Sequence, residues 1–329
     1  MAVIRWLLGR LAAAALVAWV VATVVFFALR TAGGDPSEAI LGGPGSQTGP
    51  EAMARVREEY LLDEPLVVQY LVQLARTATF QLGDSYARRR PVSELIGDQI
   101  GGTLVLAAVA LALAWLIALA VATIATLARG RRARSAAGVL RGAEVVASVM
   151  PHFWLGAVLI AFFAGGLGWL PATSNDNSPA ALLLPAITLA VPVAGFLGQV
   201  MRDSLDEAHL APFATTSRTR GASEQWVLWR HSLRHAALPA IALSGWAFGS
   251  LLSGAVVVET LFGRPGLGRL LIEATHARDV PVVIGVVLVI ALGYVVVMSV
   301  ADLLERAVDP RLRDRVRVLA SAPKGEVMG

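Results

Sequence analysis

Long apolar stretches alternate with short polar ones along most of this 329-residue chain. A helix that rises 1.5 Å per residue needs about 20 apolar residues to cross ~30 Å of hydrocarbon. Six uncharged runs are long enough: Leu11–Leu29, Thr103–Ala128, Val145–Leu170, Ala180–Met201, Ala236–Val258 and Val280–Ala301. Because lipid offers the backbone no hydrogen-bond partner, each run is predicted to be a helix. The pattern therefore predicts an all-α membrane protein with six transmembrane helices.

These runs divide the chain into four parts. Residues 1–30 form the N-terminus and the first helix, 31–99 a polar segment, 100–305 the other five helices with the loop 202–235, and 306–329 a tail. The first run is longer than a typical signal-peptide core, and the ALRTAGGDP stretch after it offers no small-x-small cleavage site. We therefore expect the first run to be a retained span.

Arginines predict which side of the membrane each loop occupies. The loop 129–135, the loop 202–235 and the tail 305–317 are basic, whereas 171–179 has no basic residue. The positive-inside rule then places both termini and the 202–235 loop in the cytoplasm, and 31–99 outside. Arg88–Arg90 fall on the outer side, in a long loop where the rule is weak.

The external segment 31–99 begins with a turn-rich link, GGPGSQTGP at 42–50. Two later stretches place apolar residues at helical spacing, for example Leu66, Tyr70 and Leu74. They predict short amphipathic helices on the outer membrane face. A lid packed on the spans and a docking surface are both open as their role.

The loop 202–235 is longer and more organised than a turn between two spans requires. Residues 213–220 can form two helical turns, and Gly221 can then adopt a left-handed cap. Ser223 is a good N-cap for a second helix, with Glu224 in its first turn. That helix carries two pairs of basic residues four apart: Arg230 and Arg234, and His231 and His235. Such a helix–corner–helix knob could dock a cytoplasmic partner, although topology alone also demands basic loops.

Composition removes several function classes. The 28 basic residues are 27 arginines and one lysine, and the net charge of +4 does not suggest a nucleic-acid partner. The absence of cysteine excludes disulfides and thiolate chemistry. Lys324 lies far from any glycine-rich loop, so there is no P-loop for ATP hydrolysis, and no metalloprotease or serine-elbow motif occurs either. We expect this chain not to be an enzyme.

Several motifs together resemble those of permeases of ATP-binding-cassette (ABC) importers, in the branch that carries dipeptides, oligopeptides and nickel. That branch typically reads T-A-R-A-K-G followed by H-A-L-(R/K)-x-A-x-L-P. This chain has TSRTRG at 216–221 and HSLRHAALP at 231–239. Collinear matches continue at GDP (34–36), LDEP (62–65), MPHFW (150–154), ETLFGRPGLG (259–268), RDVPV (278–282) and VDPRLR (308–313).

The resemblance implies a type I ABC importer permease fold in a bacterial cytoplasmic (inner) membrane. It implies four kinds of partner: a second homologous permease, two ABC ATPase subunits, an external substrate-binding protein and membrane lipid. ATP and Mg would be bound by the ATPase subunits, and no cofactor by this chain. It also implies an ATPase-coupling loop made of Phe213, Thr216, Ser217, Arg218, Arg220, Gly221, His231 and Arg234.

Three further residues are candidates for the pathway or an outer gate: Glu259, Asp279 and Ile284. Structural roles at the interface are the alternative for the two acids. Relatives often have an aromatic residue and a glutamine where this chain has Val280 and Ile284, so a pathway there would be more apolar. His152 could bind nickel, but a lone histidine is more often a core residue.

The function predicted is import of di- or oligopeptides. The alternatives are import of nickel or another small solute such as glutathione by the same machinery, or a stand-alone secondary transporter. A secondary transporter would be expected to show charged residues or paired broken helices at mid-membrane, and the six runs show neither clearly.

Overall fold

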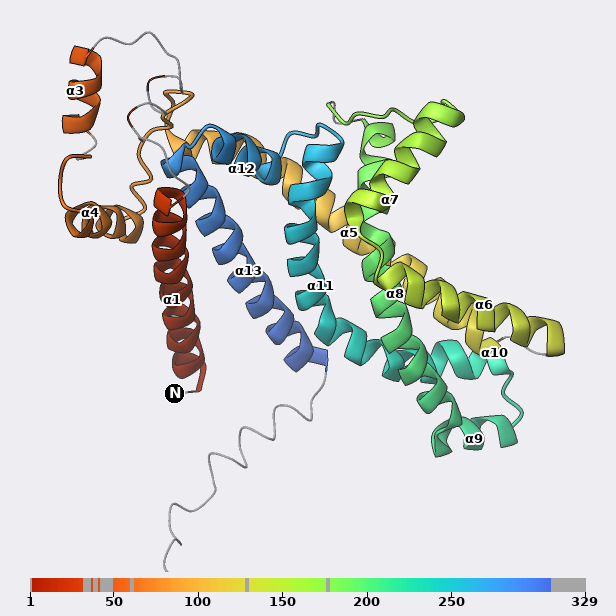
Figure 1. The fold of residues 1–329 in the computed structure, drawn as a ribbon. Helices are drawn as coiled ribbons and strands as arrows, with labels where there is room; N and C mark the ends of the chain where they lie inside the picture. Colours follow the sequence, from red (N-terminus) through yellow and green to blue (C-terminus); the bar gives the residue numbers. More distant parts are fainter. Residues whose placement is uncertain are drawn as a thin grey trace, which may run out of the picture. The chain divides into compact units, whose positions relative to one another are not determined.

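The computed structural model describes residues 2–31, 37, 41, 50–59, 62–127, 130–175 and 178–308. The motif at 34–36, the link at 42–49 and the tail beyond 308 lie outside the described residues. The described elements, drawn in Figure 1, are α1 (Ala2–Thr31), α3 (Pro50–Glu59), α4 (Leu66–Ala78), α5 (Val92–Leu127), α6 (Gly130–Ser148), α7 (His152–Leu159), the π-helix η1 (Ile160–Gly166), α8 (Pro179–Leu210), α9 (Pro212–Thr219), α10 (Glu224–Val227), the π-helix η2 (Leu228–Ser232), α11 (Leu233–Leu261), α12 (Leu267–His276) and α13 (Val280–Val308).

Over the described residues, five of the six predicted spans coincide with continuous helices, and Ala128, the last residue of the second run, lies outside the described residues. Helices α1, α5, α8 and α13, and the segment 224–261, are long and apolar enough to cross a membrane. The described residues thus hold five such helices, or six if the bent pair 135–148 and 152–166 forms one span. The all-α prediction is therefore confirmed for the part of the chain that the structure describes.

The third span departs from the prediction of one continuous helix over Val145–Leu170. The helix is interrupted between Ser148 and His152, so α6 and α7 are separate elements. Pro151 explains the break, because proline has no N–H to donate and disfavours helical backbone at the residue before it. The run Val145–Leu170 is therefore not one continuous helix.

The chain forms two compact units, one of residues 1–110, 150–190 and 249–296, and the other of 111–149, 191–248 and 297–329. In the first unit, the start of α5 packs on α12 and α13 through buried side chains such as Val92, Leu270 and Val283. Glycines allow close approach there: a Cβ on Gly102 would lie 2.6 Å from the Pro265 carbonyl oxygen. The core of the second unit is made by α5, α8 and the segment that ends in α11, through Ala122, Met201, Leu205, Leu228, Ala236 and Ala240.

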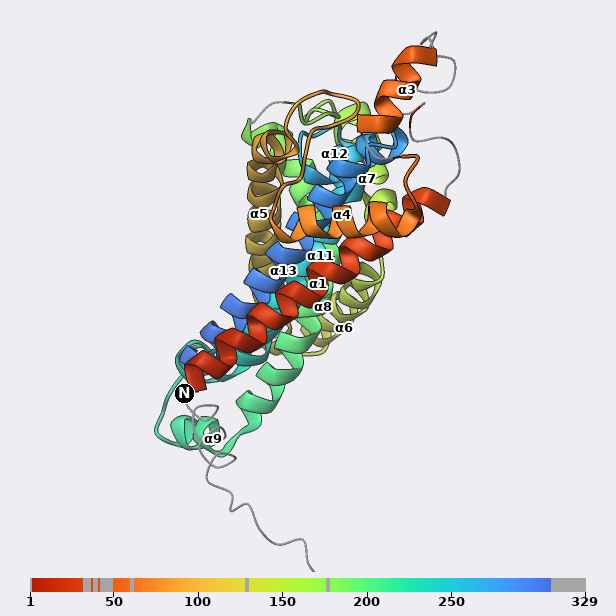
Figure 2. The same cartoon turned by 90° about the vertical axis from the view of Figure 1, so that its left-hand side faces the viewer.

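The two short helices predicted within 31–99 are present as α3 and α4, and α4 lies across α1 within the first unit (Figure 2). The side of the membrane on which they lie stays a prediction. The Tyr70 hydroxyl accepts a hydrogen bond from Trp19 Nε1 at 3.1 Å and lies 2.8 Å from Thr23 Oγ1. Apolar side chains on α4, including Val67 and Leu71, are exposed. Tyr70 thus joins α4 to α1, and the exposed apolar side chains of α4 suit contact with lipid.

Candidate functional site

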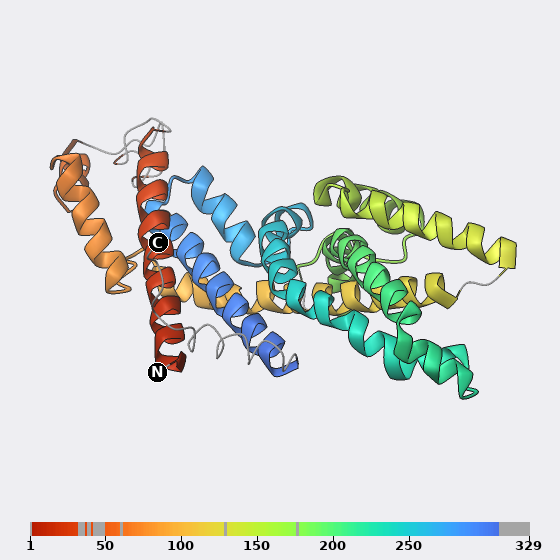
Figure 3. The ribbon, with the colours of Figure 1, turned by 90° about the horizontal axis from the view of Figure 1, so that it is seen from below.

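The loop between α8 and α11, in the second unit, is a short helix, a sharp corner and a return helix (the green-to-teal part of Figures 1 and 3). Helix α8 ends at Leu210, and α9 begins at Pro212 because proline suits the first helical position, where no N–H is needed. Helix α9 covers Pro212–Thr219, which matches the predicted two turns.

The corner after α9 is a Schellman motif centred on Gly221, which has a φ of +87°. The Gly221 N–H donates to the Arg218 carbonyl at 2.9 Å, and the Ala222 N–H donates to the Ser217 carbonyl at 3.1 Å. Glycine adopts this left-handed backbone without the Cβ crowding that other residues meet. The predicted glycine cap is confirmed.

Ser223 caps the return helix, as predicted. Its side-chain oxygen accepts a hydrogen bond from the Trp226 N–H at 3.3 Å, and Glu224 is in the first turn. The sequence predicts a regular helix beyond it, but Leu228–Ser232 form a π-helical turn. His231 and His235, four residues apart, both lie near Phe213, with ring centroids 6.4 and 4.9 Å from its ring.

A polar network that the sequence did not reveal ties the loop together. Glu224 accepts a hydrogen bond from Arg218 Nε at 3.1 Å and contacts His209 Nε2 at 2.8 Å. Arg218 Nη2 also donates to the His209 carbonyl at 2.9 Å, and His209 Nδ1 lies 3.3 Å from Ser232 Oγ. We call His209, Arg218, Glu224 and Ser232 the loop clamp. It joins the end of α8, the end of α9 and the start of the return helix.

The clamp changes the interpretation of Arg218. The family resemblance implies a coupling loop that includes both Arg218 and Arg220, but the Arg218 side chain is only 26% exposed and bonds within the loop. Arg220 is exposed, as is Arg234. Thr216 and Ser217 donate their hydroxyls to carbonyls of their own helix, at Pro212 and Phe213. The structure thus separates residues that hold the loop from residues that lie on its surface.

Removing the charge of Glu224 tests the clamp. In Glu224→Gln the charge-assisted bonds to Arg218 and His209 are lost, which we expect to cost roughly 1 kcal/mol because the carboxylate is partly exposed. Backbone amides at 217–224 of the purified chain should then exchange hydrogen about fivefold faster. Glu207→Gln, the same change at an exposed position on α8, is the control. Equal exchange in both variants would contradict the clamp.

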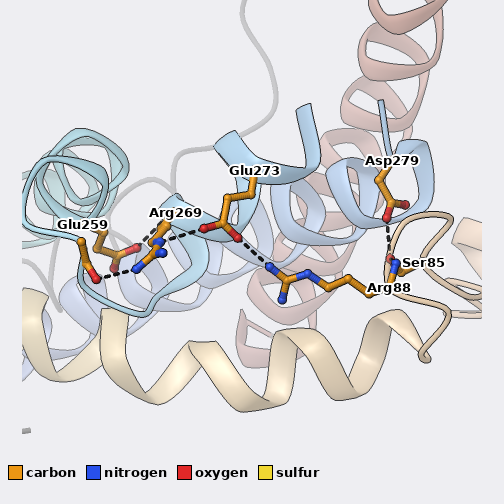
Figure 4. Close-up of polar contacts among 7 residues, drawn as sticks. Ser85, Arg88, Glu259, Arg269, Glu273 and Asp279 are labelled. Carbon is orange, nitrogen blue, oxygen red and sulfur yellow. Dashed lines mark hydrogen bonds and ion pairs between the residues drawn. The ribbon is translucent and has the colours of Figure 1, made fainter. Parts of the chain in front are cut away.

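The outer candidates Glu259, Asp279 and Ile284 are all buried in the first unit, at 0, 2 and 1% exposure. Asp279 accepts a hydrogen bond from Ser85 Oγ at 2.5 Å and one from the Ala87 N–H at 3.2 Å (Figure 4). It therefore fastens the loop before α5 to the start of α13. None of the three lines an open surface in this structure, and their role in a pathway stays a prediction.

Glu259 holds the start of α12. Its carboxylate accepts hydrogen bonds from Thr103 Oγ1 at 2.6 Å and from the N–H groups of Gly268 and Arg269 at 2.8 and 3.2 Å. A negative charge at a helix N-terminus is favoured by the helix dipole. A Cβ on Gly266 would collide with the Glu259 carboxylate, which explains a glycine at that position.

The apolar helices long enough to cross a membrane, and the structured loop between α8 and α11, define a multi-pass membrane protein. Residues 118–314 match the family described as binding-protein-dependent transport system inner membrane component, and residues 3–107 match its N-terminal domain. The chain belongs to this family and is a permease subunit of a binding-protein-dependent ABC importer. The members of this family form the membrane component of such importers, which does not itself carry out catalysis.

Similar proteins agree with this assignment. The glutathione transport system permease protein GsiC of Salmonella typhimurium is 34% identical over 294 residues, covering 89% of this chain and 94% of that protein. A Brucella abortus protein described as a putative peptide transport system permease is 35% identical over 314 residues, covering 93% and 98%.

Two solved structures share the fold. The MetNI methionine ABC transporter in an inward-facing conformation aligns with a TM-score of 0.55 at 18% identity, covering 67% of this chain and 98% of that chain. An amino acid ABC transporter with histidines aligns with a TM-score of 0.52 at 16% identity, covering 65% and 94%.

Proposed function

We propose that this permease imports small peptides, with glutathione among the cargoes to be tested first. The observation that carries the proposal is the similarity, along about nine-tenths of the chain, to permeases described as carrying glutathione or peptides. Nickel import by the same machinery is the alternative that the sequence left open, and it differs in needing metal ligands along the pathway.

The loop around Gly221 is the element through which ATP drives the permease in this proposal. A permease must be biased between two conformations, and moving a population from 1:99 to 99:1 takes about 5.5 kcal/mol. Two ABC ATPase subunits, which would hold ATP and Mg, supply that energy by moving a rigid surface of the permease. The Gly221 corner and the loop clamp support this role, because they make α9 a stiff element. Exposed Arg220 is the basic side chain best placed to meet the ATPase.

The proposed topology has both termini and the 202–235 loop in the cytoplasm, and 31–99 with α12 outside. The distribution of arginines supports it. A second homologous permease would complete the pathway, and an external binding protein would deliver the cargo. These two partners are the part of the proposal that a purification can test directly.

The test is to express this chain with its neighbouring gene products and purify it in mild detergent. The complex should retain an ATPase and a second permease, and in liposomes it should take up a labelled tripeptide only with ATP and the binding protein. ATP-dependent uptake of nickel but not of peptides would replace the proposed cargo. Uptake by the chain alone without ATP would refute the proposed mechanism.

A further inference from the structure

A small polar cleft lies in the first unit, beside the N-terminal turn of α12. It has a volume of about 180 Å³, and its polar lining consists of Arg88 from the loop before α5, Gln99 from α5, and Arg269 and Glu273 from α12. Figure 4 shows Arg88 and Arg269 pointing to Glu273 from opposite sides. In the proposed topology this cleft faces the outside, where cargo arrives.

Glu273 is shared by the two arginines and does not saturate either of them. Arg88 Nη2 donates to one Glu273 oxygen at 2.6 Å, and Arg269 Nε donates to the other oxygen at 2.8 Å. Neither pair uses two parallel N–H groups of one guanidinium, which is the geometry that binds a carboxylate most strongly. Arg269 Nη1 also donates to the Gly263 carbonyl at 2.5 Å. Each guanidinium still has further N–H groups beyond these bonds, since a guanidinium carries five.

The lining is therefore rich in donors and carries net positive charge. Two guanidinium groups face one carboxylate, and all three side chains are about 40% exposed. Among the described residues, no side-chain hydrogen bond engages the Gln99 amide, which can donate to an anion. The buried carboxylate of Glu259 already accepts bonds from Thr103 and the start of α12, so it does not compete for these donors.

We propose that this cleft binds a carboxylate of the cargo, such as the C-terminal carboxylate of a peptide, between Arg88, Arg269 and Gln99. The assignment rests on the proposed function, since it takes the cargo to be a peptide. The cleft is smaller than the about 300–1,000 Å³ of sites that enclose a whole drug-sized ligand. It is a subsite for one end of the cargo.

The first experiment measures binding without transport. The purified permease complex is treated with phenylglyoxal, which modifies arginines, and the rate at each arginine is read by mass spectrometry. A dipeptide with a free carboxylate should slow modification of Arg88 and Arg269 at least threefold, whereas its C-terminal amide should not. Arg90 is the internal control, because its guanidinium bonds to Glu94 and Asp98 outside the cleft. Equal rates with the acid and the amide would overturn the proposal.

The second experiment measures ATP-dependent uptake of the same two peptides with one binding protein. In Arg88→Gln the ratio of acid to amide uptake should fall about fivefold or more, and Gln99→Leu should lower it without touching the Arg88–Glu273 pair. Arg90→Gln, the same change of charge outside the cleft, should leave the ratio unchanged. The binding protein's own preference for one peptide affects wild type and variant equally, so it cancels when the variant's ratio is compared with that of wild type.

The outcomes separate this site from the proposed function. An equal fall for both peptides in Arg88→Gln would make Arg88 a structural residue and refute the cleft. If Arg88→Gln weakens the affinity of the permease for the binding protein whichever peptide is bound, Arg88 contacts a carboxylate of that protein and not one of the cargo. This result also refutes a cargo site. Protection of Arg88 in a complex that transports no peptide would refute the proposed function and leave the carboxylate site standing.

Discussion

Replacement of Gly221 by valine is expected to reduce ATP-driven uptake by roughly tenfold or more while the chain still inserts and folds. The backbone at this corner has a φ of +87°, and left-handed backbone costs about 1–2 kcal/mol for an ordinary L-residue. A β-branched residue is worse suited still. Space is not the problem, because a Cβ on Gly221 would meet no atom within 4 Å. The expected defect therefore comes from a changed corner, not from a clash.

Gly168 provides a matched control for this prediction. It also has a positive φ, of +63°, and a Cβ there would likewise meet no atom within 4 Å, but it lies in the other unit, after η1. Gly168→Val introduces the same kind of backbone strain away from the loop and should leave ATPase binding and uptake near wild type. Uptake, ATP hydrolysis and retention of the ATPase on the purified complex are measured for both variants. Normal uptake by Gly221→Val would refute the coupling role of the corner.

The parts of the fold that the sequence predicted correctly are those set by local rules. Gly221 and Ser223 are cap residues whose preference is intrinsic, so the corner could be predicted from a few letters. The long apolar runs are also predicted by a simple rule, because a backbone in lipid must form its hydrogen bonds within the helix. The break at Pro151 is also visible in the sequence, but the uncharged run around it wrongly indicates one continuous helix.

The parts that could not be predicted depend on contacts between distant segments. Arg218 and Glu224 have opposite charges on either side of a glycine corner, a signal that could have suggested their pairing. The contribution of His209 could not have been found in this way, because it requires the end of α8 to lie against the return helix. The cleft beside α12 is more remote still, since Arg88 and Glu273 are 185 residues apart.

Glu259 was a candidate pathway residue in the sequence, but in the structure its bonds hold the start of α12 in place. In the sequence it is an acid near the end of a span. A charge inside the membrane has a high free-energy cost, so an acid there is a candidate for function. In the structure the carboxylate is fully buried and fixes α12, which carries Arg269 and Glu273 of the cleft. Its contribution to transport is then to position α12, and its first effect on mutation should be a loss of stability.

Glu259→Ala is expected to destabilise the first unit by several kcal/mol, the largest effect on folding among the changes considered. It leaves the N–H groups of Gly268 and Arg269 and the Thr103 hydroxyl without their acceptor, and each buried orphaned group costs about 1–3 kcal/mol. The unfolding temperature in detergent should fall by roughly 2–4 °C per kcal/mol for a unit of this size. Glu259→Gln keeps one carbonyl acceptor for the helix N–H groups and should lose less.

Thr260→Ala is the matched control for Glu259→Ala, because Thr260 is the next residue but is exposed, and its hydroxyl donates to the Val256 carbonyl of its own helix. It should change the unfolding temperature little. If Glu259→Ala melts like wild type, the buried carboxylate does not hold α12, and a role in the pathway would become the better explanation for an acid at this position.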